Sequence, residues 1–335
     1  MSFQNLETSM RRRDFLTLLG GAAVWPSFAQ AQLPSGIRRI SILHSGFPLR
    51  TRVRLLIEAL RTLGYDDGKT ATIELLGGEG DPSRLESLAV DLATRKPEVT
   101  IALTSPAVRA LKDAGVKTPV VFAFVSDPIA LGIVNGLAHP GANITGITYS
   151  QAGLGGKRLD LLLEALPRTK RVAIIWGRSL SENATIVENT RQAAKSRGVE
   201  LFTRDIDGAD DLVPAFDEAK NSGADALVFV TDNLFFGRRK EIAELALSRH
   251  LPSMHSFSDE VEDGGMMSYG PELKESYERA AVLAARILNG AHPADLPVEE
   301  PTRFEFAINL KTAKALGIIV PASLLMTADE IIEQD

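Results

Sequence analysis

The chain contains no cysteine, so disulfide bonds and thiolate ligands play no part in its stability or chemistry. A chain of 335 residues without disulfides depends on a hydrophobic core of useful size. The same absence excludes a lipid anchor carried on a cysteine. If the protein is exported, we therefore expect it to be free in solution rather than a lipoprotein.

The chain also has no excess of positive charge: it contains 37 Lys and Arg residues and 43 Asp and Glu residues, which gives a net charge of −6. A mildly acidic chain without basic clusters argues against nucleic acid or an anionic membrane as partner. The common catalytic motifs are absent: there is no His-Glu-x-x-His, no Gly-x-Ser-x-Gly, no Walker loop, and no Gly-x-Gly-x-x-Gly after the first predicted strand. The five histidines form no metal-like pair. The sequence thus predicts no enzyme activity, no metal and no cofactor.

The one pronounced apolar run near the N-terminus, from Phe15 to about Phe28, is too short and too broken by glycine and proline for a permanent membrane anchor. Arginines 11–13 precede it, and a small-residue cleavage site, Ala29-Gln30-Ala31, follows it. This order is typical of a secretory signal, and Arg12-Arg13-Asp14-Phe15-Leu16 resembles the twin-arginine export signal. We predict that residues 1–31 are a signal peptide and that the mature protein is soluble in the periplasm. The alternative is an intracellular protein whose N-terminus only imitates a signal, and the start at Met1 or Met10 stays open.

From residue 38 onward, short apolar strands alternate with segments of helical periodicity. Strands are predicted at 39–43, 71–76, 99–103, 119–125, 171–176, 199–204, 226–230, 252–255 and 303–309. Helices are predicted at 53–63, from 81, and at 107–114, 154–166, 184–197, 212–221, 236–249, 277–288 and 311–316. Two successive runs of this alternation predict an α/β protein with two parallel-sheet lobes. We place the N-terminal lobe at 37–146 plus about 271–292, the C-terminal lobe at 147–270, and at 293–335 a segment that crosses back over a multi-segment hinge.

Polar residues at the predicted strand ends are the candidate ligand contacts, because open α/β sheets bind ligands at the carboxyl ends of their strands. Thr104 and Ser105 follow the third strand, with Ser105 as the expected N-cap of the next helix and a donor to a ligand carboxylate. Asp127 ends the fourth strand, and Asp232 with Asn233 occupies the comparable place in the second lobe. Two carboxylates on opposing lobes can bind an ammonium group or hydroxyls. Plain helix capping is the alternative for each of these residues.

Aromatic residues make up only 6% of the chain, yet several lie near predicted strand ends. Among them Phe47, Tyr149, Phe257 and Tyr269 are predicted to line an apolar part of the cleft. Burial in the core is the alternative for each one.

Five stretches together resemble one family. They are Asp127-Pro128 with Leu131-Gly132, residues 139–146 (HPGANITG), 264–270 (GGMMSYG), 294–299 (ADLPVE) and 309–313 (NLKTA). In order and spacing they resemble the substrate-binding proteins of ABC transporters, in the group related to tryptophan- and tyrosine-binding members, and the likeness runs from about Arg38 to Ile332.

This resemblance implies a type I periplasmic-binding-protein fold, in which two Rossmann-like lobes on a three-segment hinge enclose a ligand without catalysis or metal. It places Ser45, Thr104, Ser105, Asp127, Asp232, Asn233 and Tyr269 on ligand-facing loops. The first loop, His44-Ser45-Gly46-Phe47-Pro48, lacks the acidic-His-Pro pattern of the amino-acid-binding members. An amino acid and a small aromatic or aliphatic carboxylate are therefore both compatible ligands.

The expected function is capture of a small organic solute by hinge closure and its delivery to an ABC permease in the inner membrane, by a protein that is a monomer. Two other functions stay open. One is a periplasmic sensor module that signals to a receptor, and the other is an exported α/β enzyme with an unrecognised site.

Overall fold

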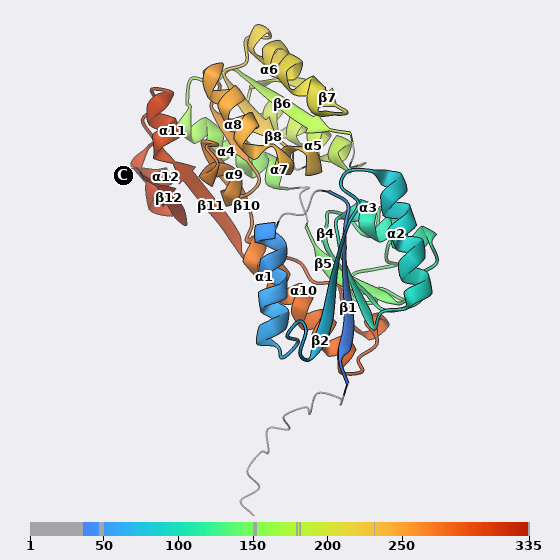
Figure 1. Ribbon diagram of the computed structural model, residues 1–335. Coiled ribbons are helices and arrows are strands. Elements are labelled where there is room, and N and C mark those ends of the chain that lie inside the picture. Colours follow the sequence, from blue (N-terminus) through green and yellow to red (C-terminus); the bar gives the residue numbers. More distant parts are fainter. Residues whose placement is uncertain are drawn as a thin grey trace, which may run out of the picture. The chain divides into compact units, whose positions relative to one another are not determined.

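The computed structural model describes residues 36–46, 50–149, 153–178, 180, 182–230 and 232–333, with the backbone alone for 50–52 and 233 (Figure 1). These residues belong to one compact unit, Ser35–Asp335. The predicted signal peptide, residues 1–31, lies outside the described residues. In the part of the chain that the structure describes, no helix is both long and apolar enough to cross a bilayer.

The first lobe is built on a five-stranded sheet in which all neighbouring strands are parallel. Its strands are β1 (Arg38–His44), β2 (Ala71–Gly77), β3 (Val99–Leu103), β4 (Val120–Val125) and β5 (Ile144–Thr148), in the order β2-β1-β3-β4-β5. Runs of Val, Ile and Leu fit this arrangement because a parallel sheet is covered on both faces; every residue of β3, for example, is buried. The first four strands confirm the sequence prediction.

Strand β5 was not predicted, because Gly146 at its centre reads as a break in a strand. In the structure a Cβ on Gly146 would overlap the backbone oxygen and ring of Phe122 on β4. The glycine therefore permits a close approach of two strands, and β5 occupies the edge where the sequence pattern suggested only a join between lobes.

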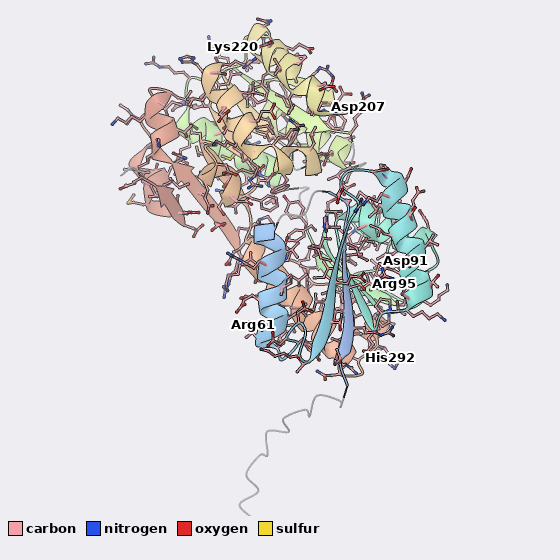
Figure 2. The ribbon with its side chains drawn as sticks, viewed as in Figure 1. Arg61, Asp91, Arg95, Asp207, Lys220 and His292 are labelled. Atoms are coloured by element: carbon pink, nitrogen blue, oxygen red, sulfur yellow. The ribbon has the colours of Figure 1, made fainter. Side chains whose placement is uncertain are left out.

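Two layers of helices cover the first sheet (Figure 1). Helices α1 (Arg50–Thr62) and α10 (Leu273–Leu288) pack on one face, and α2 (Pro82–Arg95) and α3 (Ser105–Asp113) on the other. The predicted start of this helix is confirmed, because Asp81 is the N-cap of α2 and its Oδ1 accepts a hydrogen bond from the Ser83 N–H at 2.9 Å. Charged residues lie on the outer surface, such as Asp91 and Arg95, which form an ion pair of 2.7 Å (Figure 2).

The second lobe is built on a seven-stranded sheet. Its strands are β6 (Arg171–Gly177), β7 (Glu200–Ile206), β8 (Ala226–Phe229), β9 (Ser253–His255), β10 (Met267–Pro271), β11 (Phe304–Asn309) and β12 (Glu330–Ile332), in the order β12-β11-β10-β9-β8-β6-β7. From β7 to β10 the strands are parallel and repeat the order of the first sheet, whereas β11 pairs antiparallel with β10. The predicted strand at 303–309 is thus an added strand of this sheet.

Helices also cover both faces of the second sheet. Helices α4 (Leu154–Ala165), α5 (Asn183–Ser196) and α12 (Ala322–Thr327) pack on one face, and α6 (Leu212–Asn221) and α8 (Arg239–Ser248) on the other. Three short helices complete the lobe: α7 (Asn233–Gly237), α9 (Ser258–Glu262) and α11 (Leu310–Ala315). The prediction of a single helix at 236–249 is wrong, because two helices occupy this stretch. Its first turn belongs to α7, and Arg238, with φ −125°, separates α7 from α8.

The described chain passes between the two sheets at three places: from β5 to α4, from β10 to α10, and from residues 296–299 to β11. Residues 296–299 run beside β5, where the Thr145 hydroxyl donates to the Leu296 carbonyl at 2.8 Å and Ile147 bridges Glu299. Two of the crossings therefore leave the first lobe at β5 or beside it. The third starts from α10, which packs against β5.

Two of the stretches that carry the family resemblance have structural roles. Asn309 caps α11 by accepting from the Thr312 N–H at 2.9 Å, and its amide donates to the Val261 carbonyl at 2.9 Å. The Thr312 hydroxyl donates to the Gly264 carbonyl at 2.9 Å. These bonds fix the turn before β10 against β11.

Candidate functional site

Each sheet has a point where successive strands are added on opposite sides, between β1 and β3 in the first lobe and between β6 and β8 in the second. Chain segments diverge there, which leaves a crevice at the carboxyl ends of the strands, the usual binding place in open α/β sheets. The residues that follow these four strands are therefore the first place to look for a ligand site.

In the first lobe, two hydroxyls meet at this point. The Ser45 and Thr104 hydroxyl oxygens, which follow β1 and β3, are 2.7 Å apart in a hydrogen bond. Thr104 has φ +88°, a conformation that is strained for a β-branched residue. Phe124, at the end of the neighbouring β4, also has a positive φ of 61°. Such strain persists only where the surroundings enforce it, and it gathers at ligand sites.

The N-cap of helix α3 lies one residue earlier than predicted. Thr104, not Ser105, is its N-cap, so Ser105 and Pro106 form the first turn, and no side chain of the cap residue closes it. The Ser105 side chain, 3% exposed, instead donates to Glu182 Oε1 at 2.6 Å. Glu182 lies in the second lobe, immediately before α5.

Sequence reasoning missed Glu182, although the signal was available. It lies in the loop between β6 and α5, directly before the helix, and β6 borders the crevice of its sheet as β1 does in the first lobe. Extending the search to the whole loop between β6 and α5 would have included it.

In the second lobe, Asp232 follows β8 and is 1% exposed. Its Oδ1 accepts from the Leu234 N–H at 2.9 Å and so caps α7. The carboxylate also lies against Gly177 at the end of β6, where any Cβ would overlap it. Gly177 is thus required for the carboxylate to occupy this place beside the end of β6.

An aromatic cluster, defined here as Phe124, Tyr149, Phe236 and Phe257, joins the two lobes beside these polar groups. The Tyr149 and Phe257 rings stack with centroids 5.3 Å apart, and Phe236 lies 5.2 Å from Phe257. Phe124 contacts Tyr149 edge-on at 6.2 Å. Tyr149 and Phe257 were predicted as cleft residues; Phe124 and Phe236 were not. The stacking of Tyr149 and Phe257 on one another fills the space between these two rings.

Hydroxyls flank this cluster at three strand ends. Ser126, Thr148 and Ser256 follow or end β4, β5 and β9, and their hydroxyl oxygens are buried without a hydrogen bond to the residues that the structure describes. A buried polar group without a partner is costly and calls for an explanation. A ligand bound at the strand ends would supply the missing partners.

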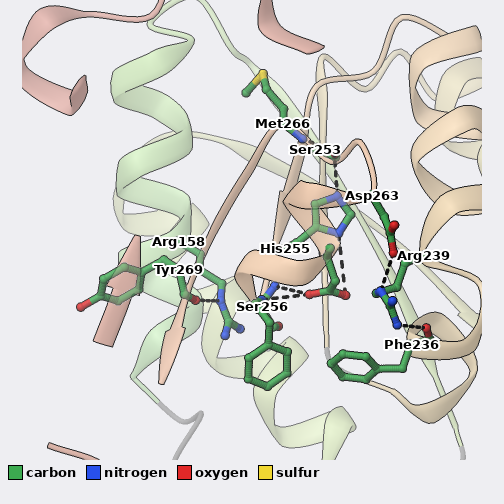
Figure 3. A network of polar contacts seen from close by, with 11 residues as sticks. Arg158, Phe236, Arg239, Ser253, His255, Ser256, Asp263, Met266 and Tyr269 are labelled. Carbon is green, nitrogen blue, oxygen red and sulfur yellow. Dashed lines mark hydrogen bonds and ion pairs between the residues drawn. The ribbon is translucent and has the colours of Figure 1, made fainter. Parts of the chain in front are cut away.

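Arg158 on α4 extends between Tyr269 and Ser256 (Figure 3). Its side chain is 1% exposed, and Nε donates to the Tyr269 carbonyl on β10 at 2.7 Å. Glu260 fixes the adjoining turn by accepting from the Ser256 and Phe257 N–H groups at 3.0 and 2.9 Å. These contacts hold Phe257 and the end of β10 in one rigid arrangement.

The remaining predicted site residues lie elsewhere. Asp127 is exposed and caps a turn, accepting from the Ala130 N–H at 2.9 Å. The Tyr269 ring points away from Ser256 (Figure 3) and stacks on Phe304 with centroids 6.0 Å apart. Phe47 lies outside the described residues, and of Asn233 only the backbone, which begins α7, is described. Among the described residues, no group of three or more His, Asp or Glu side chains is arranged to hold a metal.

His44 ends β1 beside the Ser45 loop. Burial lowers the pKa of its imidazole, although a hydrogen bond to the Gly46 backbone and the charge of Glu79 oppose that shift. The folded chain therefore binds fewer protons at His44 than the unfolded chain, whose imidazole titrates near pH 6.5.

We expect the free energy of unfolding to fall as the pH drops below 6.5 toward the lowered pKa of His44, by at most about 1.4 kcal/mol per pH unit for one proton. Urea denaturation at pH 7.5 and 5.5 measures this, and His44→Asn should flatten the dependence. His292→Gln, at an exposed position, is the matched control and should retain it. A wild-type slope that survives in His44→Asn would assign the effect to other groups.

Several known proteins are similar to this chain in sequence or in fold. The tyrosine-binding protein of Clostridioides difficile (strain R20291) is 26% identical over 262 residues, which is 78% of this chain and 75% of that protein. In fold, the chain resembles a conserved domain protein of Vibrio cholerae, with a TM-score of 0.83 and 22% identity over 88% of this chain and 100% of that one. It also resembles an ABC domain from Streptococcus pneumonia in complex with L-Trp, with a TM-score of 0.81 and 24% identity over 89% of this chain and 100% of that one.

A model of one family matches residues 40–332, nearly all of the described chain. Members of this family bind substrates and are not enzymes. The two parallel-sheet lobes are those of type I periplasmic binding proteins. The chain belongs to the family of ABC transporter substrate binding proteins.

Proposed function

We propose that this chain is the periplasmic solute-binding component of an ABC importer and that it encloses a zwitterionic small molecule, an α-amino acid, between its lobes. The observation that carries the proposal is the pairing of unlike groups at the two strand crossover points. Hydroxyls of Ser45 and Thr104 lie on the first lobe, and the buried carboxylate of Asp232 lies on the second.

Each part of such a ligand has a matching group. The ammonium group pairs with Asp232, whose carboxylate gains from a charged donor in a water-poor crevice. The ligand carboxylate is received by the Ser45 and Thr104 hydroxyls, which follow β1 and β3. The ligand side chain packs against the aromatic cluster, with Ser126, Thr148 and Ser256 available for its polar atoms. The similarity to a tyrosine-binding protein and to a domain in complex with L-Trp supports this class of ligand.

The proposed mechanism is hinge closure about the three chain crossings. A ligand that contacts both lobes favours the closed form because only there does it make all of its contacts. Export by the predicted twin-arginine signal at residues 1–31 would deliver the chain, as a monomer, to the compartment where an inner-membrane permease collects the solute.

A thermal-unfolding screen of the full chain tests the ligand class. L-Tyrosine, L-tryptophan and L-leucine are compared with tryptamine, which lacks the carboxylate, and with indole-3-propionate, which lacks the ammonium group. A ligand present at 100 times its Kd stabilises the folded state by about 2.7 kcal/mol. We expect at least one amino acid to raise the unfolding temperature and both truncated analogues to lose most of that effect.

Two results would contradict the proposal. Stabilisation by indole-3-propionate equal to that by L-tryptophan would remove the role of the ammonium group and favour a simple carboxylate. Turnover of a bound compound would favour an exported enzyme instead.

A further inference from the structure

We propose that the Ser105–Glu182 hydrogen bond is an interlobe latch, which holds the closed form and slows ligand release. The proposal rests on the hinge closure proposed above. It assigns to Glu182 a positioning role, in which its carboxylate acts on the lobes rather than on the ligand.

The chemistry of the contact suits a latch. The Ser105 hydroxyl carries a single proton, and at 2.6 Å that proton is committed to Glu182 Oε1. A hydrogen bond to a carboxylate is stronger than one between neutral groups. In addition, Ser105 occupies the first turn of α3, a helix of nine residues whose N-cap supplies no side-chain hydrogen bond. The carboxylate of the other lobe therefore complements the positive end of that helix.

The position of the contact also suits a latch. The chain crossings lie at β5 and α10 in the first lobe and enter the second lobe through α4, β10 and β11. Ser105 follows β3, two strands from β5, and Glu182 follows β6, three strands from β10. Three members of the aromatic cluster lie nearer the crossings, with Phe124 in β4, Tyr149 after β5 and Phe257 after β9. The fourth, Phe236 on α7, packs against Phe257. A rotation about the crossings separates distant groups most, so the Ser105–Glu182 bond breaks early in opening.

The surroundings provide a matched control. Ser105 and Glu182 border a pocket of about 250 Å³ whose other charged lining residues are Glu86, Arg109 and Asp113 of the first lobe. Glu86 carries the same charge beside the same pocket. Glu86→Ala removes a nearby negative charge while leaving the hydrogen bond between the lobes intact.

A distance measurement between the lobes tests the latch without any ligand. Because the chain has no cysteine, Val90→Cys on α2 and Val213→Cys on α6 introduce two unique sites for spin labels. Both positions are exposed, at 58% and 45%. Pulsed dipolar spectroscopy then gives the closed and open populations of the full chain, with Glu182 present and with Glu182→Ala.

We expect a short-distance population in the parent chain, and a closed-to-open ratio about tenfold lower in Glu182→Ala. Ser105→Ala should have the same effect, and the double variant should add nothing, because each removes the same bond. Glu86→Ala should leave the ratio unchanged. A ratio that Glu182→Ala does not alter, additive effects of the two single variants, or an equal effect of Glu86→Ala would overturn the latch.

Release of L-tryptophan, followed by stopped-flow fluorescence, separates this proposal from the ligand assignment. We expect Glu182→Ala to raise the dissociation rate about tenfold and to change the association rate less than threefold. If the parent chain does not bind L-tryptophan, the ligand class fails while the distance measurement still decides the latch. If it binds and Glu182→Ala releases it at the parent rate, the latch fails while the ligand class stands.

Discussion

Replacing Gly270 with alanine is expected to lower the free energy of unfolding by about 3 kcal/mol. Gly270 lies at the end of β10, where its Cα faces the backbone oxygen of Ser256 so closely that any Cβ would overlap it. Because the obstacle is backbone rather than the end of a flexible side chain, the added methyl group must move β9 or β10. Arg158 Nη2 lies 3.4 Å from the position of the new Cβ and limits the movement of the methyl group in that direction.

Urea denaturation of the full chain measures this loss. Gly208→Ala is the control, since no atom lies within 4 Å of the position of its Cβ and its backbone is extended, with φ −154°. We expect that control to stay within about 0.5 kcal/mol of the parent. The Gly270 variant should also bind ligand more weakly, because a displaced Ser256 carries Phe257 out of the aromatic cluster. A Gly270→Ala protein as stable as the parent would mean that the two strands separate easily at the hinge.

Replacing Asp232 with asparagine is expected to weaken ligand binding by roughly a hundredfold while leaving stability nearly unchanged. Asparagine caps a helix about as well as aspartate, so the bond to the Leu234 N–H is kept. What is lost is the negative charge at the end of β8. If that charge pairs with a ligand ammonium group, only binding responds.

Isothermal titration with the amino acid found in the screen measures the affinity, and urea denaturation measures the stability. Asp81→Asn is the control for the loss of a capping charge, because Asp81 caps α2 through the same kind of bond to the Ser83 N–H but is exposed, whereas Asp232 is buried. It should change neither quantity. Should Asp232→Asn bind as tightly as the parent, the carboxylate serves only α7, and the ligand ammonium must pair elsewhere.

Local sequence patterns accounted for most of the secondary structure, and the exceptions share a cause. Strand β3 follows from a run of five residues, Val99–Leu103, that suits a fully buried strand. Helix α6 follows from apolar residues at helical spacing. Strand β5 was missed because Gly146 carries no local strand signal; its reason is the proximity of Phe122, a contact between strands. The break between α7 and α8 likewise depends on Asp232, whose capping bond starts a new helix before the predicted one.

The candidate site divides in the same way. Position at a strand end singled out Thr104, Ser105, Asp232, Tyr149 and Phe257, and the family resemblance added Ser45. The structure brings these close to the two crossover points and the aromatic cluster. The same rule singled out Asp127 and Tyr269, which the structure turns toward a solvent-exposed turn and toward Phe304. A strand-end position fixes where the backbone of a residue lies, whereas the direction of its side chain depends on neighbours that are distant in sequence.

The sequence by itself determined the α/β class, the absence of disulfides and the likeness to substrate-binding proteins, because periodicity, composition and ordered motifs are properties of the chain alone. Only the tertiary structure decided that Ser105 meets Glu182 and that Tyr149 stacks on Phe257. Each of these pairs joins two lobes that fold around separate cores. No local pattern records such a pairing, since it depends on how the three chain crossings set one sheet edge against the other.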